Sequence, residues 1–146
     1  MKKVAYIIWQ YLIAIPILAV LTLFTAIYTI IFVHWHNAKF VWYVQRFWAK
    51  SICRMFLLPI DVSGLENIDP KQSYVCVSNH QSMFDVFLIY GWLPIIFKWL
   101  MKQELRKVPF VGTACKAAGH IFINRSNSKS AMNSILEAKA VLQDGV

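Results

Sequence analysis

The sequence lacks charged side chains over a long stretch near its start. Residues 4–38 contain no Asp, Glu, Lys or Arg, and only Lys2 and Lys3 among the 15 Lys and Arg precede them. An uncharged run of this length is not typical of a soluble surface, because about 20 apolar residues in a helix suffice to cross a bilayer. The sequence therefore predicts a membrane segment at its N-terminal end.

Acidic residues are scarce in this chain. Seven Asp and Glu stand against 15 Lys and Arg, which gives a formal net charge of +8 and a pI near 9.6. This balance favours anionic partners, and the long apolar run favours lipid among them. Nucleic acid is not an expected partner, because the sequence has no recognised DNA-binding motif and no aromatic RNA-binding signature.

Cysteines are few and show no CxxC spacing. The three of them, Cys53, Cys76 and Cys115, form an odd number. A disulfide framework is not expected, and a reducing compartment with buried free thiols fits this usage. The length of 146 residues allows one domain, or one domain with an anchor.

Residues 4–33 predict a retained membrane helix. This run is about twice as long as the apolar part of a secretory signal, and no small-x-small cleavage site follows it. As a helix this run would be about 45 Å long, whereas the hydrocarbon core of a bilayer is about 30 Å thick. It therefore tilts, kinks near Pro16, or runs partly along the interface. The aromatic residues that suit the headgroup level are Tyr6, Trp9, Tyr11 and Trp35.

Two histidines interrupt the end of this run. His34 and His36 could suggest a metal site, but no third ligand lies nearby in the sequence. Polar residues at a helix end explain them more simply, and no metal is expected here.

Residues 39–58 predict a second helix with a basic stripe on an aromatic surface. At about 100° per residue, four cations fall within one narrow arc. They are Lys39, Arg46, Lys50 and Arg54. The stripe is typical of a helix on an anionic bilayer, and the alternative is a helix packed on the domain with a solvated basic face. The excess of positive charge after the first helix favours a cytoplasmic remainder.

After Pro59 the pattern alternates between short strands and helices, which predicts an α/β domain. Strands are expected at residues 60–63, 73–77, 95–101 and 120–124. The second of these is expected to be covered on both faces. Helices are expected at residues 82–91, 109–118 and 128–143, with Gly119 ending the second and Gly145 the third. Because a final helix of this kind usually returns the chain to another strand, we expect the domain to be incomplete.

The stretch around residues 74–85 carries the candidate chemistry. His80 follows a predicted strand, and Asp85 follows five residues later. A neutral imidazole can take a proton from a hydroxyl, and a carboxylate can orient it. Ser82 lies close by but has no GxSxG elbow, so attack by a substrate hydroxyl is favoured over an acyl-enzyme. Taken alone, the pair is weak evidence for catalysis, and a capping aspartate beside a hydrogen-bonded structural histidine is the favoured interpretation.

Three motifs in order resemble the 1-acyl-glycerol-3-phosphate acyltransferases of the phospholipid/glycerol acyltransferase family. Residues 79–85 match NHxxxxD. Residues 102–112 are similar to KxEL followed by PxxG, and residues 119–125 to GxxFIxR, with Asn124 where that family often has Asp. The resemblance covers residues 59–146 and implies a glycerol-phosphate-acyltransferase-like α/β domain. Residues 1–58 would then be a membrane-associated two-helix region, which also occurs in members of that family.

The resemblance implies acyl transfer from acyl-CoA or acyl-carrier protein to the free hydroxyl of lysophosphatidic acid, giving phosphatidic acid. His80 would be the general base, Asp85 its orienting partner, and Arg125 with Lys102 would bind the acceptor phosphate. No cofactor is implied, since the thioester is already activated. The expected location is a membrane, the bacterial inner membrane, with the catalytic domain on the cytoplasmic side.

The resemblance also implies an EGTR-like third motif, which the sequence does not contain. This absence keeps a second hypothesis open, a non-catalytic membrane fragment that binds anionic lipid through the basic stripe. A third keeps the chemistry and changes the glycerolipid acceptor. Lys102 as a plain surface charge, and Arg125 as the partner of a carboxylate, also remain open.

Overall fold

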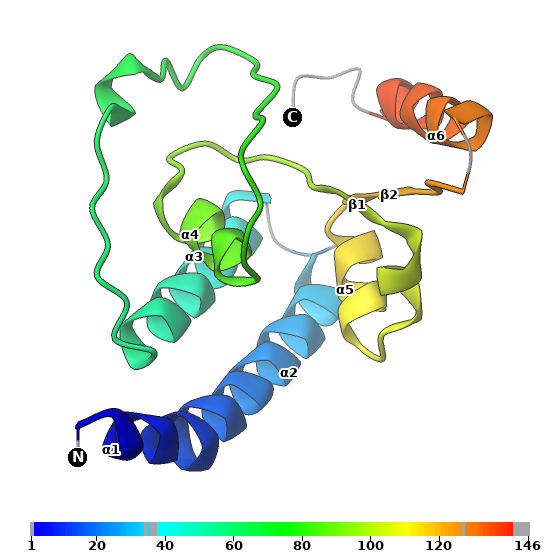
Figure 1. Cartoon of the computed structure of the whole chain (residues 1–146). Helices are drawn as coiled ribbons and strands as arrows, with labels where there is room; N and C mark the ends of the chain where they lie inside the picture. The colour runs from blue at the N-terminus through cyan, green and yellow to red at the C-terminus, as the bar shows by residue number, and fades with distance from the viewer. Residues whose placement is uncertain (1, 34, 36–37, 127, 142–146) are drawn as a thin grey trace. The chain divides into compact units, whose positions relative to one another are not determined.

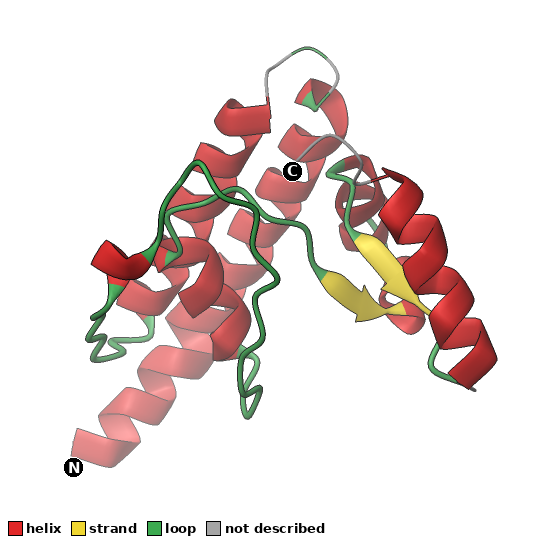
Figure 2. Cartoon of the chain, turned by 90° about the horizontal axis from the view of Figure 1, so that it is seen from above, coloured by secondary structure: helices red, strands yellow, loops and turns green. Residues whose placement is uncertain are grey.

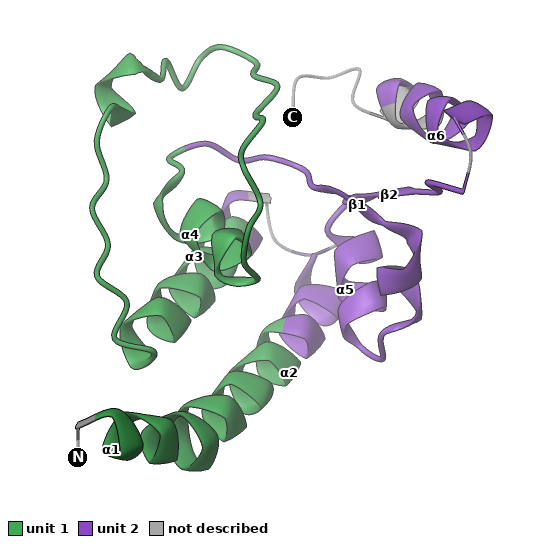
Figure 3. Cartoon of the chain, viewed as in Figure 1, with its two compact units in different colours: residues 1–25, 42–94 green, residues 26–41, 95–146 purple. Residues whose placement is uncertain are grey.

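The computed structural model describes residues 2–33, 35, 38–126 and 128–141. These residues form two compact units, each described here by itself (Figure 3). Unit 1 comprises residues 1–25 and 42–94, and unit 2 comprises residues 26–41 and 95–146. His34, His36 and the predicted cap Gly145 lie outside the described residues.

The predicted membrane helix forms in three consecutive pieces. They are α1 (Lys2–Trp9), a π-helical segment η1 (Gln10–Ala14), and α2 (Ile15–Phe32). In η1 the amide of Ile15 donates to the carbonyl of Gln10, five residues before it, and the helix axis bends there (Figure 1). Pro16 has no amide hydrogen and its ring crowds the preceding turn, so a widened turn relieves the conflict. By length and composition, residues Lys3–Phe32 could cross a membrane.

The second predicted helix is α3 (Ala38–Met55), and it runs antiparallel to the first helix. In unit 1 the indole of Trp48 donates to Thr22 Oγ1 at 3.1 Å, and in unit 2 the rings of Tyr28 and Phe40 lie 6.1 Å apart. Along these contacts the residue number in α2 rises while the residue number in α3 falls. This order defines an antiparallel helix hairpin.

Two aromatic side chains of α1 serve the end of α3. The hydroxyl of Tyr6 donates to the carbonyl of Phe56 at 2.8 Å, and Trp9 Nε1 donates to the carbonyl of Met55 at 3.0 Å. The last carbonyls of a helix have no partner within the helix, so these bonds supply one. Tyr6 and Trp9 were among the aromatic residues that the sequence suggested for the headgroup level. In the structure their polar groups donate hydrogen bonds to the end of α3.

Helices α3 and α5 (Val111–Ala117) end in the same way, with different residues at the critical position. After α3, Leu58 donates to the carbonyl of Cys53 and Leu57 to that of Arg54. After α5, His120 donates to Cys115 and Gly119 to Lys116. Both are Schellman endings, which place one residue at positive φ. That residue is Gly119 (φ 78°) after α5, as predicted, and Leu57 (φ 53°) after α3.

Helix α4 (Phe84–Trp92) is held on α3 by aromatic rings in unit 1. Phe84 meets Phe56 with centroids 5.1 Å apart, and Trp48 meets Phe87 at 5.0 Å. Edge-to-face pairs at this separation add to the apolar area that they bury. The start of α4, where the candidate site lies, is therefore anchored to the end of α3.

The basic stripe on α3 is partly engaged within the protein. Arg46 Nη1 donates to the carbonyl of Leu93, the C-cap of α4, and Lys50 Nζ lies 5.4 Å from the ring centre of Trp92. Burial lowers the pKa of Lys50, and the positive charges of Arg46 and Arg54 add to this effect. Cations at a helix C-terminus are favourable because they meet the negative end of the dipole. Two of the four stripe cations thus face α4, whereas the packed-helix alternative expected the whole basic face to be solvated.

The predicted strands at residues 60–63 and 73–77 are wrong. A single 3₁₀ turn, η2 (Leu65–Asn67), interrupts a long loop between α3 and α4. Val75 and Val77, on one face of that segment, are 92% and 91% exposed, and Cys76 on the other face is exposed as well, so neither face is covered. β-branched residues favour a strand only where a neighbouring strand pairs with their backbone. Within the described residues, no strand lies beside this segment.

Unit 2 contains a small parallel sheet. Strand β1 (Leu100–Lys102) pairs with β2 (Ile121–Ile123) in the register Leu100↔Ile121 to Lys102↔Ile123 (Figure 2). Between them lie η3 (Gln103–Lys107) and α5, and α6 (Ser128–Val141) follows β2. The prediction for β2 matches it closely, whereas β1 overlaps the strand predicted at residues 95–101 only at Leu100 and Met101. The described chain is mostly helical with a small parallel sheet, so the α/β prediction is confirmed only in that coarser form.

We expect Leu57→Gly to stabilise the protein by about 0.5–1 kcal/mol. A side chain at positive φ is strained, whereas glycine adopts this conformation readily. Leu57 is also 67% exposed, so its loss removes little burial. Denaturant unfolding of the protein in detergent micelles measures the change.

The neighbouring change Leu58→Gly serves as the matched control, because Leu58 does not have positive φ and is half-buried. It should lower stability. A loss of stability in both variants would contradict the assignment of strain to Leu57.

Candidate active site

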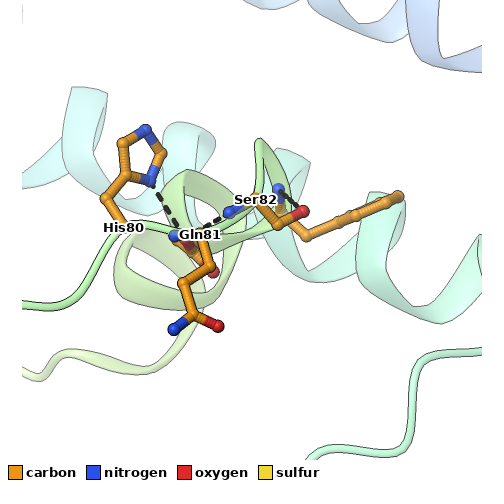
Figure 4. Close-up of polar contacts among 5 residues, drawn as sticks. His80, Gln81 and Ser82 are labelled. Atoms are coloured by element: carbon orange, nitrogen blue, oxygen red, sulfur yellow. Dashed lines mark hydrogen bonds and ion pairs between the residues drawn. The ribbon is translucent and has the colours of Figure 1, made fainter.

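His80 and Asp85 meet at the start of α4 (Figure 4). His80 Nδ1 lies 3.0 Å from Asp85 Oδ2, although the residues are five apart in sequence. The same carboxylate oxygen accepts the amide hydrogens of Gln81 at 2.7 Å and Ser82 at 2.8 Å. The loop from His80 to Ser82 therefore wraps around one oxygen, and this wrapping brings the ring to the carboxylate.

Asp85 is held in its ionised form. The Ser82 amide lowers the pKa of its carboxyl most, followed by the His80 ring, with a smaller contribution from the Gln81 amide. An ionised carboxylate only accepts hydrogen bonds, so Nδ1 must carry the hydrogen that it shares with Asp85. The lone pair of the neutral ring then lies on Nε2. Because the His80 side chain is 64% exposed, Nε2 can meet a ligand from solvent.

Ser82 has a structural partner in the same loop. Its hydroxyl accepts the amide hydrogen of Phe84, the first residue of α4, at 3.2 Å. A bond from a serine hydroxyl to the amide two residues later forms an ST-turn, which here precedes the helix. This bond gives the Ser82 hydroxyl a structural role, so the presence of Ser82 in the loop does not require that it act as a nucleophile.

His120, by contrast, is unsuited to base catalysis. It is buried, and its Nδ1 accepts the amide hydrogen of Trp99 at 3.3 Å. Burial lowers the pKa of His120 to about 4, and the charge of Lys98 contributes. Of the two histidines that the structure describes, only His80 presents its ring to solvent.

Lys102 and Arg125 lie at the carboxyl end of the parallel sheet in unit 2. Lys102 is the last residue of β1 and pairs in register with Ile123, and Arg125 follows Ile123 by two residues. Both side chains are exposed. The carboxyl ends of parallel strands are where ligands bind in open α/β sheets. The structure thus brings these two residues to one end of the sheet, as it brings His80 to Asp85 within unit 1.

Asn124, Gly112 and Lys98 support the sheet and the segments next to it through contacts that the sequence did not predict. Asn124 Oδ1 accepts the amide hydrogen of Ser126 at 3.0 Å, which forms a turn around Arg125. A Cβ on Gly112 would collide with the carbonyl oxygen of Arg106, so only glycine lets α5 approach η3 this closely. At the opposite, amino end of the sheet, Lys98 Nζ donates to the carbonyl of Ala118 at 2.7 Å. The sequence could have indicated the role of Asn124, because a short polar side chain directly before Arg125 favours a turn.

An apolar groove of about 270 Å³ runs along α4 in unit 1. From α4 it is lined by Leu88, Ile89 and Trp92, and from the preceding loop by Ile60, Val62 and Leu65. Leu88 and Ile89 stand three and four residues after Asp85, so they share its face of the helix. The groove therefore begins about one turn from the candidate carboxylate.

A family model described as Acyltransferase matches residues 59–146. The chain belongs to the acyltransferase family. It is 32% identical over 99 residues to the 1-acyl-sn-glycerol-3-phosphate acyltransferase alpha of Homo sapiens, which covers 68% of this chain and 35% of that protein. It is 30% identical over 94 residues to the 1-acyl-sn-glycerol-3-phosphate acyltransferase of Saccharomyces cerevisiae, covering 64% and 31%.

A longer alignment joins the chain to the 1-acyl-sn-glycerol-3-phosphate acyltransferase of Chlamydomonas reinhardtii. The two are 23% identical over 145 residues, which cover 99% of this chain and 42% of that protein. The chain thus spans less than half the length of these relatives. No solved structure matches it significantly. The family resemblance drawn from the three motifs is confirmed. Among the described residues, no cluster of three or more His, Cys, Asp or Glu side chains could hold a metal ion.

The geometry predicts that the His80–Ser82 loop opens at acid pH. Because the pKa of Asp85 is lowered on folding, its stabilising bonds are fully present above the ordinary aspartate value of about 3.9 and are lost as pH falls through the lowered value. Amide hydrogen exchange at Gln81 and Ser82, corrected for intrinsic rates, should accelerate over that window.

In Asp85→Asn the same amides should show no acid-dependent step, because the side chain no longer titrates. The amide of Ile121, which is bonded within the sheet region of unit 2, provides an internal reference. An identical acid step in the variant would contradict the assignment to Asp85.

Proposed function

We propose that this protein transfers an acyl chain from acyl-CoA or acyl-carrier protein to the free hydroxyl of lysophosphatidic acid, giving phosphatidic acid. The observation that carries the proposal is the hydrogen bond of His80 Nδ1 to Asp85, which leaves Nε2 as an exposed base. The names of the relatives in three kingdoms supply the acceptor and the reaction class.

In the proposed step, His80 Nε2 takes the proton of the acceptor hydroxyl as its oxygen attacks the thioester carbonyl carbon. The carbon–sulfur bond of the tetrahedral intermediate then breaks, and the leaving thiolate receives the proton back from His80. Asp85 stabilises the ring while it is positively charged. The bond between Ser82 and the Phe84 amide supports direct attack by the acceptor over a serine intermediate.

The remaining parts of the site are assigned by their chemistry. Arg125 can bind the acceptor phosphate through two donors, and Lys102 can add a point charge beside it. Their common position at the sheet end supports this assignment. The groove along α4 suits an acyl chain because it is apolar and starts near Asp85.

We further propose that residues 1–58 form a membrane-associated pair of helices and that residues 59–146 form part of the acyltransferase domain. The apolar helix Lys3–Phe32 and the exposed rings of Phe40, Tyr43 and Phe47 on α3 support the first part. The distribution of Lys and Arg favours the cytoplasmic side for the domain, and we propose a bacterial inner membrane as its setting.

We expect His80→Ala to lower kcat/KM by about 10²–10⁴-fold, because the general base is lost. Acyl transfer to lysophosphatidic acid in vesicles measures this. Ser82→Ala is the matched control on the same loop. It should weaken the start of α4 by about 1 kcal/mol while leaving turnover within a few-fold of the original.

If Ser82→Ala loses turnover while its fold stays intact, the result would favour an acyl-enzyme route over direct attack by the acceptor. Lipid binding without any turnover by the unmodified chain would favour a non-catalytic lipid-binding protein. Turnover with another lysolipid alone would keep the chemistry and change the acceptor.

For Arg125 the expected effect is on the acceptor. Arg125→Lys should raise the KM for lysophosphatidic acid roughly tenfold, because lysine cannot grip phosphate through two parallel donors. The KM for the acyl donor should change little. Arg54→Lys, the same change at an exposed arginine of α3, is the control. Equal effects on both substrates would argue against a phosphate contact.

A further inference from the structure

We propose that a strained turn in unit 2 is a second lipid-contacting surface, which places Phe110 among the headgroups of an anionic bilayer. This surface, called here the 105–110 surface, comprises Leu105, Arg106, Lys107, Val108 and Phe110. It lies between β1 and α5, away from the two N-terminal helices in sequence. The proposal does not rest on acyl transfer, because it concerns only where this part of the protein touches lipid.

The first argument is the backbone at Phe110. This residue has φ 60° and ψ −48°, and the amide of Val111 donates to the carbonyl of Pro109 at 2.6 Å across it. These values define a γ-turn with positive φ, the rarer and more strained of the two forms. Glycine or asparagine would accept positive φ more easily. The chain nevertheless places a large aromatic residue there.

The second argument is that the Phe110 ring contributes little to the interior. It is 53% exposed, and its neighbours Leu105 and Val108 are exposed as well. A strained residue persists where its side chain has a task, and packing inside the described protein is not that task. A partner outside the chain is the simpler explanation for an aromatic side chain in this position.

The third argument is that the turn is held firmly. Gly112 donates to the carbonyl of Val108 at 2.9 Å and Ala114 to that of Phe110 at 2.8 Å. Gly112 also packs so closely on the carbonyl of Arg106 that no Cβ fits between them. The ring of Phe110 is therefore presented in a fixed direction, and binding loses little backbone entropy.

Charge identifies the partner. Arg106 and Lys107 are exposed between the apolar residues, and Lys102 precedes them. Glu104 is the one acidic residue of the sequence from 95 to 126, against six Lys and Arg. Aromatic and aliphatic side chains interleaved with cations suit the headgroup boundary of an anionic membrane. An acidic protein would match the cations, but it gives less reason for three exposed apolar side chains.

The test uses a fluorescent probe on the full chain in vesicles. Cys76 is exposed and is changed to Ser, whereas Cys53 is buried and burial raises the pKa of Cys115 to about 11, so both react poorly with thiol reagents. Phe110→Cys then takes a polarity-sensitive label selectively. In vesicles containing phosphatidylglycerol its emission should shift to the blue, and quenchers on the acyl chains should act on it at least twice as strongly as aqueous iodide.

The same label at Lys129→Cys, an exposed position on α6 in the same unit, should keep the emission of a label in water and be quenched mainly by iodide. Adding Arg106→Gln and Lys107→Gln to the labelled Phe110→Cys chain should weaken the blue shift, and so should high salt. A probe at position 110 that reports water like the control, or that responds equally to neutral vesicles, would overturn the proposal. A response to an acidic carrier protein in place of vesicles would also overturn it.

Discussion

The contact between α3 and α4 is the interaction on which the candidate site depends. Phe84 packs on Phe56, and Phe87 and Tyr90 pack on Trp48, so the first turn of α4 is fixed to the last turn of α3. Arg46 binds the other end of α4 through the carbonyl of Leu93. With both ends of α4 secured, Asp85 has a defined position, and the loop carrying His80 can close around its carboxylate.

The same contact ties the candidate chemistry to the apolar N-terminal helix. Tyr6 and Trp9 donate to the last carbonyls of α3, so α1 supports the helix end that supports α4. These bonds matter because a helix terminus without partners is costly to bury. In a membrane protein this arrangement would set the distance of His80 from the lipid, which is the source of the proposed acceptor and the destination of the product.

In the part of the chain that the structure describes, two non-glycine residues have positive φ, Leu57 and Phe110, and both have exposed apolar side chains. Ordinary folding would favour glycine at such positions. Their shared character suggests that contacts outside the chain contribute to the choice of residue at both. The protein would then have two contacts with lipid, one through the N-terminal helices and one through the 105–110 surface.

The sequence by itself determined what depends on local pattern. The apolar run specified a long helix, Gly119 specified the end of α5, and the NHxxxxD spacing identified the pair His80 and Asp85. The structure alone decided what depends on residues far apart in the chain. It left residues 73–77 without a strand partner, turned Arg46 and Lys50 toward α4, and gave the α3 carbonyls to Tyr6 and Trp9. Periodicity describes which faces are apolar, whereas pairing and capping require a partner that only the folded chain supplies.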